Sequence, residues 1–398
     1  MELSKRIQAM QESPIRKLVP LAEQAKKKGL SVIHMNIGQP DVKTPKAFKQ
    51  AINAFDVDVI AYSFSQGEPA LLMAIADYYQ KSGIAFAPED ILVTNGGSEA
   101  LIFAIYATCD AGDEILIPEP FYTNYNGFSK PANVQAVPIT TKSEEAFCLP
   151  KKEEIESLIT ERTKAILFSN PGNPTGAVYT QEELMMLADI AKKHDLYLIA
   201  DEVYREFVYD GLSFTSMASI PGVEDRVVIV DSISKRFSAC GARIGSLASK
   251  NQVLIASVLK LCQARLCVPT LEQVGAIELY KLGLDYFQEV KEEYDWRRNI
   301  VYEGVNQIAG AMCKKPRGAF YVVVDLPVED ADDFARWMLA DFSYEGATLM
   351  VAPAAGFYAT KGLGANQIRL AYVLEEDQLR RGLKVLEEAL KAYPARKA

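Results

Sequence analysis

The amino-acid sequence predicts an α/β fold that contains a mostly parallel sheet. Apolar segments of strand length alternate with helix-like segments between residues 90 and 248, and this alternation is typical of a parallel sheet covered by helices. Small, amide or acidic residues follow several of these strands, at the sheet edge where α/β proteins bind their ligands. The length of 398 residues is sufficient for a large core and two or three domains.

The composition is that of a globular protein and argues against several classes of partner. Hydrophobic residues make up 49% and charged residues 24% of the chain, as in ordinary globular proteins. Lysine and arginine number 43 against 52 acidic residues, and the net charge of −9 indicates neither a nucleic-acid nor a membrane partner. The N-terminus lacks a signal-peptide pattern, and no apolar run is long enough to span a membrane. Six cysteines without a C-x-x-C pair favour free thiols in the cytoplasm, and only two histidines, His34 and His194, leave no multi-histidine metal site.

The chain begins with a charged, helix-like stretch of about 30 residues. Residues 32–37 predict a short strand that runs into Gly38-Gln39-Pro40-Asp41, a sequence typical of a turn. Residues 61–67 predict a second loop, which contains Tyr62 and precedes a helix over residues 70–81.

A strand over residues 90–94 passes through Asn95-Gly96-Gly97-Ser98 into an apolar helix over residues 101–108. Backbone N–H groups at such a glycine-rich helix N-terminus form an anion-binding site. Simple turn geometry is the alternative interpretation of the same residues.

Residues 114–118 and 164–169 predict the next two strands. Aromatic residues that include Tyr122 follow the first strand, where they either stack on a planar ring or belong to the core. The second strand runs into the stretch 170–176, whose two prolines and two glycines define a rigid loop that presents an amide side chain, Asn173.

A helix over residues 181–194 and a strand over residues 196–200 come next, and Asp201 follows that strand directly. An acid in this position lies on the expected ligand side of the sheet.

Lys235 follows the apolar strand 227–230 and lies among small hydroxyl residues. A buried lysine with another cation nearby can be neutral near pH 7 and can attack a carbonyl to form a Schiff base. The hydroxyls of Ser232 and Ser234 and the guanidinium of Arg243 suit a phosphate. A lysine combined with a phosphate clamp indicates pyridoxal phosphate, whereas a solvated surface lysine is the alternative.

The last part of the chain lacks the regular alternation of strands and helices that predicts the parallel sheet. A strand over 243–248, helices to about residue 284 and a long charged helix over 286–308 lead into short strands and helices, among them a strand over 348–352, which form an α+β unit. We therefore predict a large domain, residues 45–285, and a small domain formed by residues 1–44 together with 286–398. The sequence contains no Gly-x-Gly-x-x-Gly and no Walker loop, which argues against a dinucleotide or nucleotide enzyme.

Five separated motifs occur in an order that resembles one family. They are Gly96-Gly97-Ser98, Asn170-Pro171-Gly172-Asn173-Pro174-Thr175-Gly176, Ala200-Asp201-Glu202-Val203-Tyr204, the block around Lys235, and Asn366-Gln367-Ile368-Arg369-Leu370. With these motifs the chain resembles, along nearly its full length, the fold-type I pyridoxal-phosphate enzymes, and among them the class I/II aminotransferases. The resemblance implies a large domain with a mostly parallel seven-stranded sheet and a smaller α+β domain.

The resemblance also implies roles for individual residues. Lys235 would hold the cofactor and move the substrate proton, Asp201 would pair with the pyridinium nitrogen, and Tyr122 would stack on the ring. Tyr204 and Asn173 would hydrogen-bond the phenolate oxygen of the ring. The phosphate would be bound by Gly97, Ser98, Ser232, Ser234, Arg243 and, from a neighbouring subunit, Tyr62, so that the active unit would be a homodimer.

Substrate recognition is implied at the motif that contains Arg369. This arginine would bind the substrate α-carboxylate, assisted by Asn173 and the Gly38 backbone, whereas a strand-edge surface arginine is the alternative. The chain looks closest to the bacterial and archaeal aspartate aminotransferases, some of which carry a lysine for the distal carboxylate where this chain has Ser98. We hypothesise that Arg265 supplies that charge to the partner's site; a surface arginine at a helix end is the alternative.

These features predict a transaminase with a ping-pong mechanism that acts on aspartate or glutamate with 2-oxoglutarate. The competing predictions are specificity for alanine, aromatic or other neutral amino acids, a β-lyase on the same fold, and a non-catalytic regulator.

Overall fold

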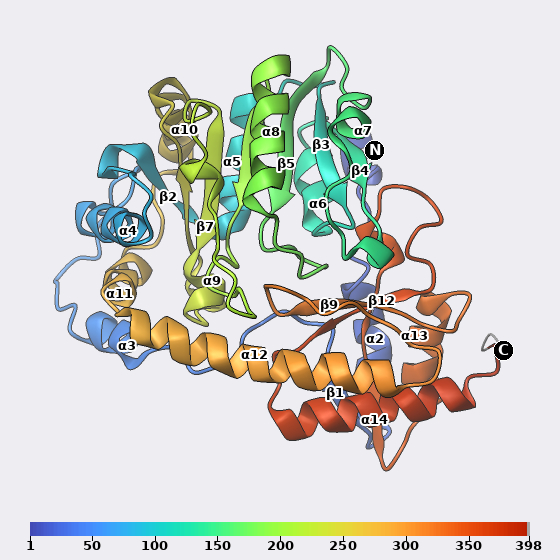
Figure 1. Cartoon of the computed structure of the whole chain (residues 1–398). Helices are drawn as coiled ribbons and strands as arrows, with labels where there is room; N and C mark the ends of the chain where they lie inside the picture. Colours follow the sequence, from blue (N-terminus) through green and yellow to red (C-terminus); the bar gives the residue numbers. More distant parts are fainter. Residues whose placement is uncertain (396–398) are drawn as a thin grey trace.

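The structure is a computed structural model that describes residues 1–395. Its largest element is a seven-stranded sheet with the strand order β2-β8-β7-β6-β5-β3-β4 (Figure 1). The strands are β2 (Ile91–Asn95), β3 (Glu114–Glu119), β4 (Gln135–Thr140), β5 (Thr163–Ser169), β6 (Tyr197–Asp201), β7 (Val227–Ser232) and β8 (Ile244–Ala248). Only β8 pairs antiparallel, with β2 and with β7, so the predicted mostly parallel α/β sheet is confirmed.

Helices cover both faces of this sheet. Successive side chains of a strand point to opposite faces, so each strand buries side chains on both. Leu116, Ile166 and Ile229 pack on one face with α4 (Pro69–Lys81) and α8 (Gln181–His194). Ile115, Leu167 and Val228 pack on the other face with α5 (Gly96–Thr108) and α10 (Gln252–Arg265). This double burial explains why the strands are apolar almost throughout rather than alternating.

The remaining strands form two small sheets. Strand β1 (Ser31–His34) pairs parallel with β10 (Ala347–Met350). A separate antiparallel sheet has the order β11-β12-β9, with β9 (Tyr321–Asp325), β11 (Ala352–Pro353) and β12 (Gln367–Ala371). One core cluster joins N-terminal residues such as Ile33 to C-terminal residues such as Leu349, so the two ends of the chain fold together.

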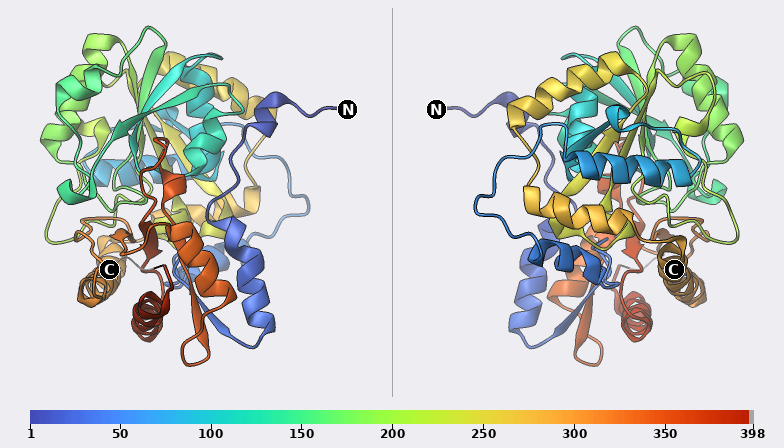
Figure 2. Two further views of the ribbon diagram at one scale, coloured as in Figure 1. Left: turned by 90° about the vertical axis from the view of Figure 1, so that its right-hand side faces the viewer. Right: turned by 90° about the vertical axis from the view of Figure 1, so that its left-hand side faces the viewer.

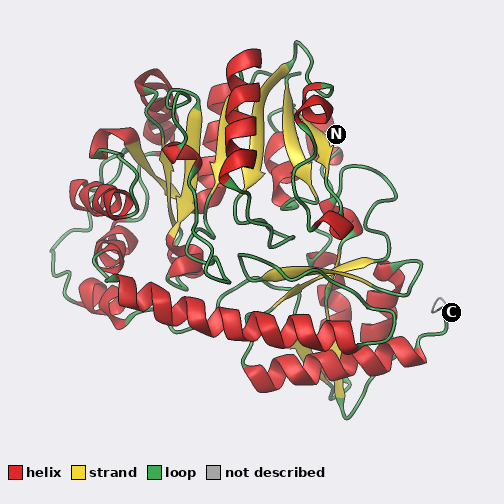
Figure 3. Ribbon diagram, in the orientation of Figure 1, coloured by secondary structure: helices red, strands yellow, loops and turns green. Residues whose placement is uncertain are grey.

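The other α-helices are α1 (Lys5–Gln8), α2 (Val19–Lys27), α3 (Lys46–Asn53), α6 (Asn124–Ser129), α7 (Lys152–Glu156), α9 (Ile233–Arg236), α11 (Thr270–Tyr280), α12 (Leu284–Gln307), α13 (Ala331–Ala340) and α14 (Glu376–Ala392). Short 3₁₀ turns occupy Arg16–Leu18, Pro88–Asp90, Ser143–Glu145, Met217–Ser219, Cys240–Ala242 and Ala355–Phe357. Helix α12 runs beneath the large sheet and continues beside α14 (Figures 1 and 3). Helix α2 lies beside α13 (Figure 2), which again unites the two chain ends.

The predicted elements agree with the structure except at some boundaries. Helix α8 has the predicted bounds because the Thr180 side chain and Glu183 form a capping box at its start. The strand predicted over 32–37 ends at His34, and the strand predicted over 348–352 is divided into β10 and β11. Strand β4 was not predicted, since this partly exposed edge strand contains Pro138 and lacks a clear apolar alternation. Among residues 1–395, no helix is both long and apolar enough to cross a membrane.

Candidate active site

The segment that carries Lys235 starts where β7 ends. Ser232 caps helix α9, because its hydroxyl accepts a hydrogen bond from the Ser234 backbone N–H at 3.1 Å. The Ser232 hydroxyl also donates to the Ser234 hydroxyl at 2.7 Å. The Lys235 ammonium is half-buried and donates to the Gly38 carbonyl oxygen at 2.8 Å. Ser232, Ser234, Lys235 and Gly38, all predicted site residues, therefore lie together.

Asp201 is the last residue of β6 and is buried. It accepts a hydrogen bond from the Tyr125 hydroxyl at 2.8 Å. Burial raises the pKa of Asp201 to about 6, because it disfavours the charged form more than the hydrogen bonds from Tyr125 and the Val203 backbone and the nearby Lys235 favour it. Within the described chain, no lysine or arginine forms an ion pair with this carboxylate. The site thus contains a buried anion that lacks a cationic partner.

Arg369 lies on β12 with an exposure of 2%. One guanidinium nitrogen donates to the Asn173 side-chain oxygen at 3.0 Å and another donates to the Asn36 carbonyl at 2.6 Å. Its Nε has no hydrogen-bond partner among residues 1–395, and the guanidinium stacks 4.5 Å from the centre of the Tyr321 ring. Burial lowers the pKa of Arg369, and no carboxylate among residues 1–395 pairs with it.

Three tyrosines lie close to the buried anion, the buried cation or both. The hydroxyls of Tyr204 and Tyr321 are 2.9 Å apart. The Tyr122 hydroxyl accepts from the Asn124 side chain at 2.7 Å, and burial, with Tyr321 and Asp201 nearby, raises the Tyr122 pKa to about 12. The phenol side chains of these tyrosines thus lie close to Asp201 or Arg369.

Glycines bring the start of α5 close to β7 and β8. A Cβ atom on Gly245 would lie 2.4 Å from the Gly96 carbonyl carbon and 2.6 Å from the Gly97 nitrogen. Gly96 has φ +75°, and a Cβ there would lie 2.3 Å from a guanidinium nitrogen of Arg243. The predicted anion-binding residues Gly97, Ser98 and Arg243 thus meet at one helix N-terminus, beside the strand end that carries Ser232.

Two predicted residues are located elsewhere in this chain. Tyr62 is 81% exposed on the loop between α3 and α4. Arg265, the last residue of α10, forms an ion pair with Glu99 at 3.2 Å and donates to the Val93 carbonyl at 3.1 Å. Neither residue bonds to Lys235, Asp201 or Arg369 within the described chain.

The sequence did not identify three residues that the structure adds to the site. Tyr125 hydrogen-bonds Asp201, the Asn36 carbonyl binds Arg369, and Tyr321 contacts both Tyr204 and Arg369. Tyr125 lies three residues after Tyr122, and the centres of the two rings are 5.6 Å apart. That spacing was the available signal for Tyr125; the Asn36 contact uses a backbone group and left no signal in the sequence.

A family model described as aminotransferase class I and II matches residues 31–386. The chain belongs to this family. This aminotransferase is 34% identical over 387 residues to a putative aminotransferase, YugH, of Bacillus subtilis, with 96% of each chain covered. It is 32% identical to a probable aspartate/prephenate aminotransferase of Aquifex aeolicus, with 98% of each covered. An aromatic-amino-acid aminotransferase of Thermococcus litoralis is 31% identical over 98% of this chain and 99% of its own.

Solved structures of aminotransferases have the same fold. A mutant aspartate aminotransferase of Thermus thermophilus superimposes with a TM-score of 0.89 at 30% identity and covers 98% of this chain and 100% of its own. An alanine aminotransferase of Pyrococcus furiosus gives a TM-score of 0.89 at 30% identity, with the same coverage. The predicted fold-type I architecture and the predicted transaminase activity are confirmed, and the aminotransferase is an enzyme of amino-group transfer.

Proposed function

We propose that this aminotransferase uses pyridoxal phosphate and transfers the amino group of aspartate or glutamate to 2-oxoglutarate by a ping-pong mechanism. One observation carries the proposal: a buried anion, Asp201, and a buried cation, Arg369, flank Tyr122 and lack partners of opposite charge within the described chain. Buried charges without partners are costly, so the pair is best explained by ligands that bring the opposite charges. A protonated pyridine ring and a substrate carboxylate are such ligands.

The residues that surround this pair fit pyridoxal phosphate. Asp201 would pair with the pyridinium nitrogen, Tyr204 and Asn173 would contact the phenolate oxygen, and Tyr122 would cover the ring face. The phosphate would be bound by Gly97, Ser98, Ser232, Ser234 and Arg243. When bound, pyridoxal phosphate supplies an electron sink for the electron pair that remains when the substrate Cα loses its proton.

The chain's own groups would carry the remaining tasks. Arg369 would bind the α-carboxylate through charged hydrogen bonds and thereby orient the Cα–H bond. The Lys235 amine, held near the Gly38 carbonyl, would take up that proton and return it at the neighbouring carbon. The buried tyrosines exclude bulk water from the region between Asp201 and Arg369.

Specificity for dicarboxylates needs a second cation, because Ser98 carries no charge. We propose Arg265 for this role, in the active site of a neighbouring subunit. Two of its nitrogens, Nε and Nη1, have no hydrogen-bond partner among the described residues, although Nε forms the ion pair with Glu99 and Nη2 donates to the Val93 carbonyl. The names of relatives favour a second candidate, specificity for alanine or aromatic amino acids, since proteins with those names match this chain over nearly its full length.

Several wider features belong to the same proposal. A homodimer would let Tyr62 reach the phosphate of the neighbouring subunit, and the exposed position of Tyr62 supports this arrangement. The free state of all six cysteines supports a cytoplasmic location. The strands between residues 91 and 248 form the large sheet, and the strands outside that range form the two small sheets. This division supports a large domain, residues 45–285, and a small domain, residues 1–44 with 286–398.

The decisive test is a single-turnover screen of amino acids on the purified protein loaded with pyridoxal phosphate. The visible absorption band of the cofactor should disappear with aspartate and glutamate and return with 2-oxoglutarate, while oxaloacetate forms from aspartate. Faster reaction with alanine or aromatic amino acids would establish the second candidate. Release of ammonia and pyruvate would indicate a β-lyase, and absence of a cofactor band would contradict the use of pyridoxal phosphate.

A further inference from the structure

A buried ion pair joins the two ends of the short segment that carries Lys235. The Arg236 guanidinium bonds both carboxylate oxygens of Asp231, and the two side chains are 0% and 1% exposed. Ser232, Ser234 and Lys235 lie between these two residues in the sequence. The pair therefore forms a side-chain clasp around three residues of the proposed active site.

This clasp supports a turn that has little stability of its own. Helix α9 is four residues long, and an isolated helix of that length is not stable in water. The Asp231 carboxylate also accepts a hydrogen bond from the Ser232 backbone N–H at 2.7 Å, and the Tyr286 hydroxyl donates to the Arg236 carbonyl at 3.2 Å. The backbone is thus held on both sides of Lys235.

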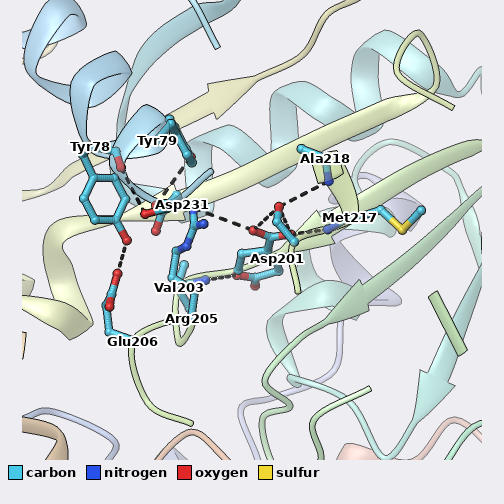
Figure 4. Close-up of polar contacts among 12 residues, drawn as sticks. Tyr78, Tyr79, Asp201, Val203, Arg205, Glu206, Met217, Ala218 and Asp231 are labelled. Carbon is cyan, nitrogen blue, oxygen red and sulfur yellow. Dashed lines mark hydrogen bonds and ion pairs between the residues drawn. The ribbon is translucent and has the colours of Figure 1, made fainter. Parts of the chain in front are cut away.

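Aromatic residues of α4 enclose the clasp. The Arg236 guanidinium lies 4.4 Å from the centre of the Tyr78 ring, and the Tyr79 hydroxyl donates to Asp231 at 3.5 Å. Figure 4 shows the Tyr78 hydroxyl directed toward the Glu206 carboxylate, with Asp231 beside both tyrosines. The titratable and charged groups that face Arg236 from the packed elements are Tyr78, Tyr79, Arg205, Glu206, Asp231 and Tyr280.

The clasp also compensates charge behind the active site. Asp231 and Asp201 lie on neighbouring strands, where Asp201 is paired in register with Val230. Burial is the main cause that raises the Asp201 pKa, and the charge of Asp231 acts in the same direction. Within residues 1–395, Arg236 is the only cation that forms an ion pair with Asp231.

We propose that Arg236 is a positioning residue that acts through Asp231: it fixes the turn that presents Lys235 and neutralises a carboxylate behind the site. This role deepens the proposed function, on which its spectroscopic test rests. Removal of Arg236 alone leaves the Asp231 anion without its ion-pair partner, which favours the protonated state of nearby groups. Removal of Asp231 alone leaves a cation and has the opposite effect.

The test compares Arg236→Gln, Asp231→Asn and the double variant, each loaded with pyridoxal phosphate. The pH midpoint of the cofactor's absorbance change should rise by about one pH unit in Arg236→Gln and fall by about as much in Asp231→Asn. The double variant should return close to the unmodified protein, because both charges are absent. A matched control is Arg298→Gln, which removes another arginine with a 0% exposed side chain that is ion-paired to an aspartate but lies on α12. It should destabilise the protein without moving the midpoint.

A second measurement does not depend on the cofactor. Modification of the Lys235 amine by an acylating reagent, followed across pH by peptide mass spectrometry, should show the same order of midpoints in the unloaded proteins. If Arg236→Gln does not fold, Arg236→Lys should keep the midpoint, because it keeps the charge, and should lower kcat, because it loses the planar guanidinium that lies against the Tyr78 ring.

Unmoved midpoints in both single variants, or shifts that do not cancel in the double variant, would reduce the clasp to a purely structural ion pair. An unmodified protein that shows no cofactor band contradicts the proposed function instead, and the modification of Lys235 then decides the role of Arg236 by itself.

Discussion

Asp201 is a carboxylate that the fold buries without a cation, although the Tyr125 hydroxyl hydrogen-bonds it. Its pKa of about 6 lies above the value of about 4 that an unfolded chain gives, because burial disfavours the charged form. This group therefore costs the fold nothing below about pH 4, and the cost grows as the pH rises and is complete above about pH 6. The expected cost is about 3 kcal/mol at pH 7.

The variant Asp201→Asn should consequently be more stable than the unmodified protein at pH 7 when neither contains a cofactor. The two proteins should melt at similar temperatures near pH 4, where Asp201 is neutral. Loaded with pyridoxal phosphate, the order should reverse, since only the carboxylate offsets the charge of the pyridinium ring. Calorimetry at both pH values measures this, and a less stable unloaded variant at pH 7 would show that Asp201 has a structural role of its own.

A second prediction for a single residue concerns Arg265 and substrate specificity. If it supplies the distal-carboxylate charge to a neighbouring subunit, Arg265→Gln should lower kcat/KM for aspartate by about 100-fold and leave kcat/KM for alanine within about threefold. The loss follows from removing the charged partner of a buried carboxylate. Steady-state kinetics with both amino acids measure it.

The matched control for Arg265 is Glu99→Gln, because Glu99 forms the ion pair with Arg265 in the same chain. This variant breaks the pair but keeps the guanidinium, so it should preserve or increase the preference for aspartate. Equal losses for aspartate and alanine in Arg265→Gln would assign the arginine to the structure of α10 rather than to specificity.

At the scale of elements, the proposed phosphate site depends on the close approach of β8 to the start of α5. Gly245→Ala would place a methyl group 2.4 Å from the Gly96 carbonyl carbon and 2.9 Å from the Asp231 carbonyl oxygen. Helix α5 would have to move away from β7, and the affinity for pyridoxal phosphate should fall at least about tenfold.

Equilibrium titration of the unloaded protein with pyridoxal phosphate measures that affinity. Gly241→Ala is the control in the same segment, since a Cβ at Gly241 would meet no described atom within 4 Å. An unchanged affinity in Gly245→Ala would exclude the start of α5 from the phosphate site.

Local patterns predicted elements better than they predicted contacts between elements. Helix α8 could be predicted because Thr180 and Glu183 provide its cap within the sequence itself. The division of the predicted strand 348–352 could not, because β10 pairs with β1 near the N-terminus, whereas β11 pairs with β12 in a different sheet. The bond between Arg236 and Asp231 was likewise not predicted, although the two residues are close in sequence, since an arginine after a site lysine resembles an ordinary surface residue.

At the scale of the whole molecule, the candidate site combines parts of the chain that fold into different sheets. Lys235 follows the large sheet, whereas its partner Gly38 follows β1, and Arg369 on β12 contacts Asn36 from the same N-terminal segment. Such an assembly could be anticipated only through a resemblance that supplied the order of the motifs. Every residue has a backbone carbonyl, so the sequence does not mark which carbonyl binds a side chain. Only the structure could therefore reveal the Asn36 carbonyl as a partner of Arg369.

The loop between α3 and α4 provides the last prediction, which concerns assembly. Its exposed apolar side chains include Val59 at 75%, Ile60 at 62%, Tyr62 at 81% and Phe64 at 64%, a concentration typical of a protein interface. Ile60→Asp should therefore convert the proposed homodimer into monomers and lower the affinity for pyridoxal phosphate, because Tyr62 would no longer reach the neighbouring site. Sedimentation velocity and cofactor titration measure the two effects. Met185→Asp, at an exposed methionine of α8, should remain dimeric, and a dimeric Ile60→Asp with unchanged affinity would remove this loop from the interface.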